Sequence, residues 1–459
     1  MNRFGVAGIK LAKAIAACVA ATVMLSAASA RADVVFYDKD GWAVYTRGLI
    51  ASHYQYAFGD GDPSTTHGVV VGGKIAAGGA EDPRGECTPT TTLDAAGNPV
   101  AGETCKPTLN LSRLRSGFIG TQLGLGVRRR INDQVNVDSL IAINLADISS
   151  NRAQESNKSV DVREAWAAVN TPYGTFKMGR MFMIFGSGSA PVVLISHQYS
   201  VGNPCFVNSP TIACASVGAG PLYAAFDAQL RYETPRFAGL QLQVAAADPW
   251  VAPTIQMTPL PRFDMELNYD QKFTESVRLR VFAQGVFQQL ERRDQMNELV
   301  KQTVMGGMGT AVLNAGGLAV GGGAWQCRGC GTRKVMEIGE SANPLAHDGK
   351  YTLRTARGFF ANAGYTMFGY TLAAGGGAAF VKPTVVDAPE LAIDPATGVL
   401  GIPNTGYSIL KQSIAYHVTF RKQIDAIILS AEYMHWKNTW HYEEKQDQTY
   451  TGVGANYTW

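Results

Sequence analysis

The sequence predicts an all-β fold, a transmembrane antiparallel β-barrel, from three observations. Glycine makes up 50 of the 459 residues and charged residues make up 17%, against about 7% and 25% in average soluble proteins. Many short segments alternate apolar and polar residues, as strands do when one side faces lipid and the other faces water. After the N-terminal segment, no stretch reaches the roughly 18 apolar residues of a membrane helix, so strands are left to span.

The N-terminus has the order of parts that export signals share, which predicts a signal peptide over residues 1–32. Basic residues precede an apolar run from Ala14 to Leu25, and small residues follow up to Ala32. Residues 33–459 then form a single barrel domain. Removing the signal's four basic residues from the 40 in the chain leaves 36 bases against 37 acids. This near-neutral balance gives no support for nucleic-acid binding.

The alternation is clearest where two expected strands flank the turn at Asn132-Asp133. Leu123, Leu125 and Val127 share one face, while polar and basic residues occupy the other. Short turns at one end and long loops at the other are typical of outer-membrane barrels. The same pattern predicts a strand Trp42–Phe58 and the hairpins Arg113–Arg130 with Val135–Leu145, Val160–Asn170 with Thr175–Arg180, Phe226–Glu233 with the strand after Phe237, Arg262–Asp270 with Ser276–Phe287, Arg354–Met367 with Tyr370–Val381, and Tyr407–Arg421 with Asp425–Lys437.

The pattern fails between residues 288 and 350, which we therefore expect to be a long outer loop. Within it, Glu291–Val304 suggests a short helix, and the glycine-rich run Met305–Ala324 is either flexible or two strands. Fourteen strands can be read from alternation alone.

A neutral segment interrupts the strand pattern in the middle of the chain. The 46 residues from Met181 to Phe226 contain no Asp, Glu, Lys or Arg, and Val192–Ile195 is too apolar for disorder. Inside a wide barrel such a loop can fold back into the lumen and narrow it. We expect residues 181–222 to form this constriction loop, with Ser187, Ser189 and His197 lining the pore.

Four short motifs carry a resemblance to a known family. They are the turn Lys39–Gly41, the pair Gly179-Arg180, the hairpin Tyr232–Pro235 followed by Phe237–Gly239, and the aromatic end at Trp459. Together they resemble the general trimeric porins of Gram-negative outer membranes, although that family usually ends in Phe. The resemblance implies 16 strands, a homotrimer, and passive diffusion of small hydrophilic solutes and ions through a water-filled channel.

The resemblance also implies roles for particular residues. Arg47 takes the place of a pore-lining base, and Tyr457 with Trp459 takes the place of the signal read by the barrel-assembly machinery. Outer-membrane lipid and lipopolysaccharide are the expected surroundings. Lumen-facing charges elsewhere in the pattern complete the candidate pore lining, which comprises Arg47, Arg128, Arg130, Lys177, Arg180, Arg231, Asp138 and Asp227. Since bases outnumber acids in this set, we expect the pore to favour anions or to admit partly apolar solutes along Val192–Ile195.

Six cysteines follow the signal segment, and they fall into sequence-local pairs. In an exported protein an even number suggests disulfides. Cys327 and Cys330 are also spaced like a redox motif or half a metal site, but no βαβ pattern or second ligand pair accompanies them. The expected bridges are Cys87–Cys105, Cys205–Cys214 and Cys327–Cys330.

Catalytic readings have less support. The seven histidines show no metal-ligand spacing, and no nucleophile elbow or phosphate-binding glycine loop occurs, so no cofactor and no metal are expected. His417 and His435 on adjacent expected strands leave a proton relay open, as in an outer-membrane hydrolase. Polar lumen residues explain them better, since every lumen face needs polar side chains. The remaining alternative is a channel selective for anionic or partly apolar substrates.

Overall fold

A computed structural model describes residues 33–61, 70–71, 74–75, 86–93, 99–106, 111–145, 160–202, 219–250, 258, 260–293, 298–331, 352–384, 410–441 and 445–459. The expected signal peptide, residues 1–32, lies outside them, as do Cys205 and Cys214. Among the described residues, no helix is long and apolar enough to cross a membrane.

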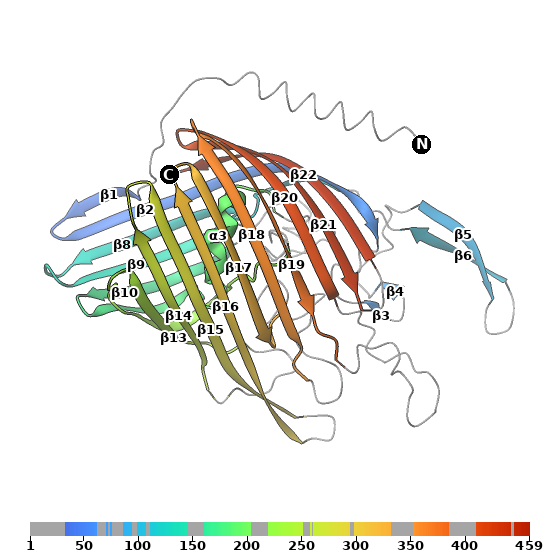
Figure 1. Cartoon of the computed structure of the whole chain (residues 1–459), viewed down its shortest axis with the longest axis horizontal. Coiled ribbons are helices and arrows are strands. Elements are labelled where there is room, and N and C mark those ends of the chain that lie inside the picture. The colour runs from blue at the N-terminus through green and yellow to red at the C-terminus, as the bar shows by residue number, and fades with distance from the viewer. Residues whose placement is uncertain are drawn as a thin grey trace.

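The described chain forms a closed antiparallel barrel of 16 strands, with β2 paired to β22 at the seam (Figure 1). The sheet contains 18 strands, and the barrel consists of all of them except the short strands β1 (Val34–Lys39) and β7 (Leu111–Arg115). The expectation of 16 strands is confirmed. In order, the barrel strands are β2 (Trp42–Gly61), β8 (Thr121–Arg130), β9 (Asn136–Leu145), β10 (Val160–Thr171), β11 (Gly174–Phe182), β12 (Phe226–Glu233), β13 (Leu240–Ala247), β14 (Arg262–Lys272), β15 (Val277–Arg293), β16 (Leu299–Ala315), β17 (Leu318–Arg328), β18 (Thr355–Met367), β19 (Tyr370–Val381), β20 (Leu410–Ile424), β21 (Ile427–Trp440) and β22 (Lys445–Thr458).

The remaining strands are additions at the ends of the barrel strands, and the helices lie inside the barrel. β1 pairs with the first residues of β2, while β7 continues the line of β8 along β2 after a break. Two small hairpins, β3 (Val70–Val71) with β4 (Lys74–Ile75) and β5 (Glu86–Leu93) with β6 (Pro99–Lys106), belong to the segment between β2 and β7. The 3-10 helix η2 (Ser187–Ser189) leads into the only α-helix among the described residues, α3 (Ala190–His197).

The turn between β1 and β2 shows how the sequence sets strand ends. Asp40 and Gly41 have φ values of 53° and 74°, the left-handed pair that a two-residue hairpin turn needs. Short turns also close all the remaining hairpins on this side of the barrel. The long segments join strands at the opposite side. In outer-membrane barrels the long loops are extracellular and the short turns periplasmic.

The expected long loop at 288–350 is wrong over most of its length. β15 continues to Arg293, and β16 and β17 pair through eleven residue pairs from Met305–Arg328 to Ala315–Leu318. Among the described residues of 291–304 no helix forms, because 291–293 end β15 and Leu299–Val304 is the first part of β16. The two strands missing from the alternation count are therefore β16 and β17.

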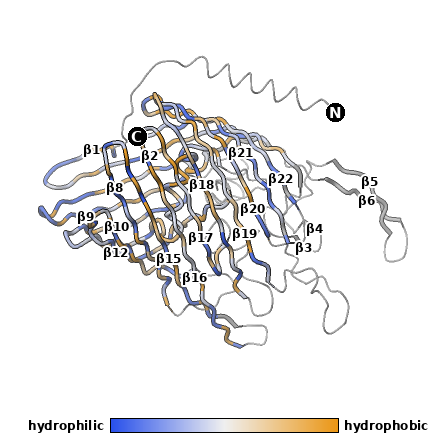
Figure 2. Tube along the Cα trace, in the orientation of Figure 1, coloured by the Kyte–Doolittle hydropathy of each residue, from blue (hydrophilic) through white to orange (hydrophobic). Residues whose placement is uncertain are grey.

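Side-chain alternation divides the wall into two faces (Figure 2). Leu125, Ile141, Met178 and Leu230 are exposed although they are apolar, and each belongs to the face opposite the ion-paired residues described below. An exposed apolar face around a closed barrel is the face that contacts lipid. The other face lines the lumen.

Candidate functional site

The neutral loop after β11 enters the lumen and runs along the inner wall. At its base the two limbs meet, where Met183 N donates to Ala225 O at 3.0 Å. Ser189 then donates to Leu222 O at 2.8 Å, and Gly186 N donates to Gln284 Oε1 on β15 at 3.0 Å. Backbone groups of the loop thus find partners on the other limb or on the wall, as buried backbone requires.

Helix α3 packs against a wall made of very small residues on β16–β19. A Cβ on Gly321 would lie 3.2 Å from Val192 Cγ2, and a Cβ on Gly364 would lie 3.0 Å from Ile195 Cγ2. These glycines let the helix approach the strand backbone closely. Val192 and Ile195 are buried in one cluster with inward residues of these strands. The apolar stretch Val192–Ile195 therefore mainly covers the wall instead of lining a solute path.

The C-terminal end of α3 is held by β20. Ser196 Oγ lies 2.8 Å from His197 Nδ1 and 2.9 Å from His417 Nε2, and the two imidazole rings are 3.8 Å apart. Arg421 donates to Ile195 O at 2.7 Å. Burial, reinforced by the facing His417 and Arg421, holds the pKa of His197 well below its ordinary value. The helix end is thus fixed by neutral imidazoles.

Beyond the helix, the loop reaches the seam of the barrel. Gln55 on β2 donates to Gly202 O at 2.8 Å, and Val201 N donates to Glu432 Oε1 on β21 at 2.9 Å. Phe118 N, between β7 and β8, donates to Ser200 O at 2.9 Å. The described part of the loop therefore covers the inner wall from β15 round to β2, opposite β8–β12.

The side of α3 that remains partly accessible is neutral. Pro191, Leu194 and Gln198 are half-buried, at the spacing of one helix face, while the residues between them are mostly buried. This face presents one amide and two apolar side chains towards the lumen.

The opposite wall carries charges arranged as pairs. Arg47 on β2 and Glu164 on β10 are 3.5 Å apart. A Cβ on Gly124 would lie 3.1 Å from Arg47 Cγ, so the arginine lies across a strand position that has no side chain. Arg47 thus takes the inward place that the family resemblance implies, with a carboxylate beside it.

A second group lies on β11 and β12. Lys177 is 2.9 Å from Glu233, and Arg231 is 3.8 Å from the same carboxylate. Arg231 also donates to Phe182 O at the start of the loop, and it is largely buried. Lys177 therefore faces the lumen, whereas Arg231 anchors the loop base.

Arg128 and Asp138 form a third pair, nearer the short turns. Their closest atoms are 3.3 Å apart, Arg128 also pairs with Asp33 at 2.6 Å, and its guanidinium lies 4.1 Å from the centre of the Tyr45 ring. Arg130 pairs instead with Asp133 in the adjoining turn. That position is at the periplasmic mouth and not at the level of the loop.

Asp227 has a partner that sequence reasoning missed. Arg262, whose side chain is 0% exposed, lies 2.5 Å from Asp227 and 2.9 Å from Asp264. Its guanidinium is also 4.3 Å from the centre of the Trp250 ring. Arg262 and Asp264 begin an expected strand and alternate towards the lumen, and this was the signal that could have found them.

Three pore-lining expectations, those for Ser189, His197 and Arg180, need correction. Ser189 and His197 are buried, because they face the wall and the second limb of the loop. Ser187 is half-buried beside Gln284 and Glu266. Arg180 pairs in register with Ala165 and Ala228 on the outward side of β11, 3.8 Å from Asp161. Lys177 and Arg180 are three residues apart, so a strand cannot turn both to the lumen.

The proton-relay alternative is also contradicted by the register. Tyr416 pairs with His435 and His417 with Met434. His417 points inward to the loop, whereas His435 stacks on the outward Tyr416 with ring centres 4.9 Å apart. The sheet separates the two imidazoles.

One of the expected disulfides is confirmed, and the last residues pair with β2. Cys327 and Cys330 form a disulfide with Cα atoms 5.5 Å apart. Cys87 and Cys105 are register partners of β5 and β6, but their side chains lie outside the described residues. Trp459 exchanges two backbone hydrogen bonds with Gly48 on β2, at 3.0 and 3.2 Å. Tyr457 points outward.

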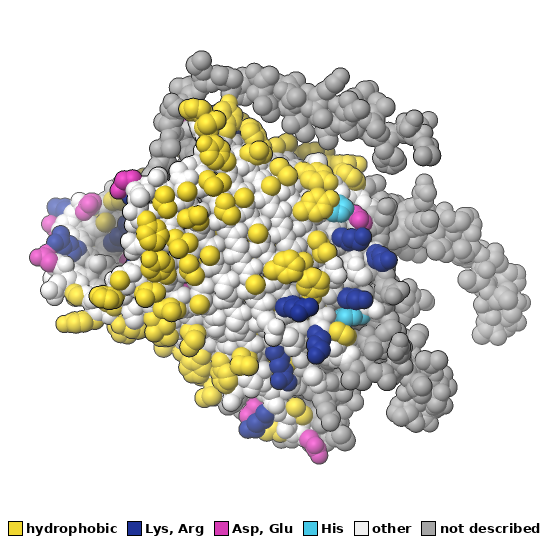
Figure 3. Space-filling model, viewed as in Figure 1, with side chains coloured by type: hydrophobic (Ala, Val, Ile, Leu, Met, Phe, Trp, Pro, Cys, Tyr) yellow, Lys and Arg dark blue, Asp and Glu magenta, His cyan; other side chains and the backbone are white. Residues whose placement is uncertain are grey.

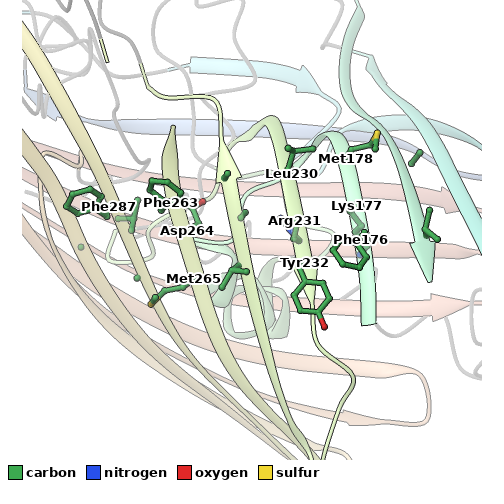
Figure 4. A pocket seen from close by; sticks show the side chains of 18 of the residues that line it. Phe176, Lys177, Met178, Leu230, Arg231, Tyr232, Phe263, Asp264, Met265 and Phe287 are labelled. Carbon is green, nitrogen blue, oxygen red and sulfur yellow. The ribbon is translucent and has the colours of Figure 1, made fainter. Parts of the chain in front are cut away.

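An apolar hollow of about 750 Å³ lies on the described surface and is not part of the lumen. It lies across the outward face of β10–β16, where Phe176, Met178, Leu230, Phe263 and Phe287 line it (Figure 4). A hollow on this face is open to lipid, so it offers no path for a solute.

The closed barrel, its apolar outer surface and the loop that narrows the lumen define a membrane β-barrel channel. The chain belongs to the Gram-negative porin family, whose model matches residues 14–459. It is accordingly an outer-membrane porin, a water-filled channel for the passive diffusion of small hydrophilic solutes and ions.

Solved structures with a similar fold come from several bacteria. The outer membrane channel DcaP of Acinetobacter baumannii has a TM-score of 0.60 and 16% identity, covering 93% of this chain and 100% of that chain. An anion-selective porin from Comamonas acidovorans has a TM-score of 0.52 and 12% identity, covering 91% and 100%. OprB of Pseudomonas putida has a TM-score of 0.50 and 11% identity, covering 91% of this chain and 94% of that chain. No curated protein sequence matches the chain.

Proposed function

We propose that solutes pass this porin through the gap between the neutral face of α3 and the ion-paired wall of β2–β12. The observation that carries the proposal is the position of the loop. Pro191, Leu194 and Gln198 form the accessible face on one side, and the pairs Arg47–Glu164 and Lys177–Glu233 lie on the inward side of the facing strands. The constriction is then neutral on one side and charged on the other.

The pairing lowers the ion selectivity below what the sequence suggested. A base with a carboxylate within 4 Å produces mainly a dipole field, which falls off faster than the field of a free charge. Some inward bases, such as Arg421 on β20, have no carboxylate within 4.0 Å among the residues that the structure describes, and they leave a small positive excess. The pore therefore prefers anions by less than about tenfold, which corresponds to about 1.4 kcal/mol.

Selectivity for partly apolar substrates is the weaker candidate. It rested on Val192–Ile195, and three of these four side chains are buried against the wall. Only Leu194 remains partly accessible. A single aliphatic side chain does not make an apolar path.

Reversal potentials in a salt gradient test the proposed gap from both sides. Leu194→Asp places a carboxylate on the neutral face and should shift the reversal potential towards cations. Glu164→Gln leaves Arg47 unpaired and should shift it towards anions. Arg130→Gln at the periplasmic mouth is the control and should change it least. If Leu194→Asp behaves like the control, the loop does not set the constriction.

The family also supports proposals about partners. We infer a homotrimer in lipid and lipopolysaccharide, folded by the barrel-assembly machinery through Tyr457 and Trp459, and acting as a channel and not as an enzyme. Cross-linking of purified protein measures the oligomeric state. The outer-membrane yield of Trp459→Ser measures the role of Trp459 in assembly. Lipase or protease activity that disappears in His417→Ala would contradict the non-enzymatic role.

A further inference from the structure

An arginine without a carboxylate partner lies on the inward face of β15, beside the constriction loop. On the face shown in Figure 3, charged side chains gather near the ends of the strands, so the charges that a solute meets lie inside the barrel. Arg280 is four residues from Gln284, which bonds to the loop, and it therefore points to the same inward side. Among the residues that the structure describes, Arg280 has no carboxylate within 4.0 Å.

The carboxylate opposite Arg280 is taken by another arginine. Asp270 on β14 is the register partner of Arg280. Both oxygens of Asp270 nevertheless accept hydrogen bonds from Arg278, at 2.7 Å from Nε and 2.5 Å from Nη2. A bidentate pair of this kind occupies the carboxylate on its accessible edge. With two arginines and one carboxylate, the group keeps a net positive charge.

Two buried donors of this part of the wall have no acceptor. Arg280 Nε and Asn314 Nδ2 on β16 are both buried, and neither makes a hydrogen bond to any residue that the structure describes. Asn314 pairs in register with Arg278, so it is a diagonal neighbour of Arg280 on the inward face. Diagonal neighbours have Cα atoms roughly 7–8 Å apart, so both side chains can reach one ligand. A buried donor without an acceptor is destabilising, and an oxygen-bearing ligand would satisfy it.

These two donors lie where the proposed solute path leaves the constriction. Arg280 pairs with Val312, and a Cβ on Gly321 would lie 2.9 Å from Val312 Cγ2 and 3.2 Å from Val192 Cγ2, in the first turn of α3. The next inward row towards the long loops is covered, since Thr310 donates to the loop backbone at 2.9 Å. Both donors are therefore at the periplasmic edge of the loop.

We propose that Arg280 and Asn314 bind the carboxylate of a small organic monoanion as it leaves the constriction. Nε and the adjacent Nη of a guanidinium form a planar fork that fits the two oxygens of a carboxylate, and the Asn314 amide adds a further donor. The net positive charge of the group matches a single negative charge. The inference rests on the proposed function, because the gap beside α3 brings solutes to these donors.

Single-channel conductance measured against the concentration of sodium acetate tests the site, because an ion that binds in the pore makes conductance saturate. Sodium chloride and sodium phosphate are the comparison probes. Three variants each make the net charge of the chain more negative by one unit. Arg280→Gln removes the fork, and Asn314→Asp places a carboxylate of the protein beside Arg280. Arg130→Gln is the matched control, since Arg130 pairs with Asp133 at the periplasmic mouth.

The wild type should saturate at a lower concentration of acetate than of chloride or phosphate. Arg280→Gln and Asn314→Asp should each raise the half-saturating acetate concentration at least about tenfold, a loss expected when charge-assisted hydrogen bonds are removed. Arg130→Gln should leave it unchanged. An equal rise in Arg130→Gln shows that charge alone attracts acetate and overturns the site. Saturation at a lower concentration of phosphate overturns the assignment to a carboxylate.

The outcomes also separate this site from the proposed gap. If Arg280→Gln keeps the wild-type acetate half-saturation while Leu194→Asp shifts the reversal potential, the gap stands and the carboxylate site is wrong. If Leu194→Asp behaves like its control while Arg280→Gln raises the acetate half-saturation, the site stands and the path past α3 is wrong. Gel mobility of the unheated protein shows whether each variant barrel is folded.

Discussion

The two halves of the inner wall differ in what their inward side chains contact. On β2–β14, most of the wall faces the open lumen and meets it with charged side chains held in pairs, such as Arg47–Glu164 and Lys177–Glu233. On β15–β21, the barrel faces its own loop, and glycines at inward positions such as Gly321 and Gly364 let the helix pack closely among larger apolar side chains. Water therefore determines side-chain chemistry on one half, and protein packing determines it on the other.

The largest expected effect comes from breaking the charged half at its buried centre. Arg262→Met leaves Asp227 and Asp264 without their common partner, and removing one member of a buried ion pair typically costs about 3–5 kcal/mol. We expect a matching drop in the free energy of unfolding, measured by urea titration in lipid vesicles.

The matched control for Arg262 is another arginine of the same wall that is not buried. Arg278 pairs with Asp270 at 2.5 Å, but its side chain is 52% exposed. Solvent screening limits such a pair to at most about 1 kcal/mol. If Arg278→Met destabilises the barrel as much as Arg262→Met, burial does not distinguish the two pairs.

Overfilling the small-residue half should come next in size. Gly364→Leu forces a side chain into the space of Ile195, and overpacking typically costs about 1–3 kcal/mol. Because the helix can move into the lumen while the strand cannot, we expect the loop to shift and single-channel conductance to change. Gly309→Leu, on the outward face of the same wall, should leave conductance unchanged.

A smaller effect follows from pH, since the small-residue half holds the helix through neutral imidazoles. The pKa of His197 is held well below its ordinary 6.5 when the loop is docked. The undocked loop then binds more protons, so docking is unaffected above pH 6.5 and weakens as pH falls below it. Conductance noise should rise in acid, and His197→Gln should reduce that pH dependence. If the His197→Gln channel keeps the wild-type dependence of conductance noise on pH, groups other than His197 cause that dependence.

Reducing the disulfide should have the smallest effect on either half. Cys327 and Cys330 close a loop of only a few residues, and chain-entropy estimates for such loops are about 2 kcal/mol at most. We expect reduced protein to keep the gel mobility of the folded barrel and its conductance. Unfolding on reduction would show that the extracellular end of β17 depends on this bridge.

The same contrast explains what the sequence could predict. Alternation identified strands such as β8 and β14 because one side of each meets lipid and the other meets water. It failed at β16 and β17, where the inward side meets the loop. There Gly306 and Gly321 occupy inward positions while Gly307 and Gly322 occupy outward ones, so neither face is polar.

The candidate site was less predictable than the strands. The loop's neutrality showed that it was unusual, but its direction depends on contacts with distant strands, such as Gly364 with Ile195. Inward bases were identified where alternation is regular, as at Arg47 and Arg128. Arg180 was misplaced because its spacing from Lys177 is odd. Partners such as Arg262 are close to Asp227 only once the strands are paired.

The seam between β2 and β22 has a consequence for the order in which the barrel can fold. Trp459 is bonded to Gly48 through both its backbone groups, and a Cβ on Gly48 would lie 2.1 Å from the Trp459 ring. Two segments that lie far apart in the sequence thus form one hydrogen-bonded edge. Until β22 pairs with β2, both strands keep unpaired hydrogen-bonding groups, which lipid cannot satisfy. Closure at this seam therefore has to precede or accompany full insertion of the two strands into the bilayer.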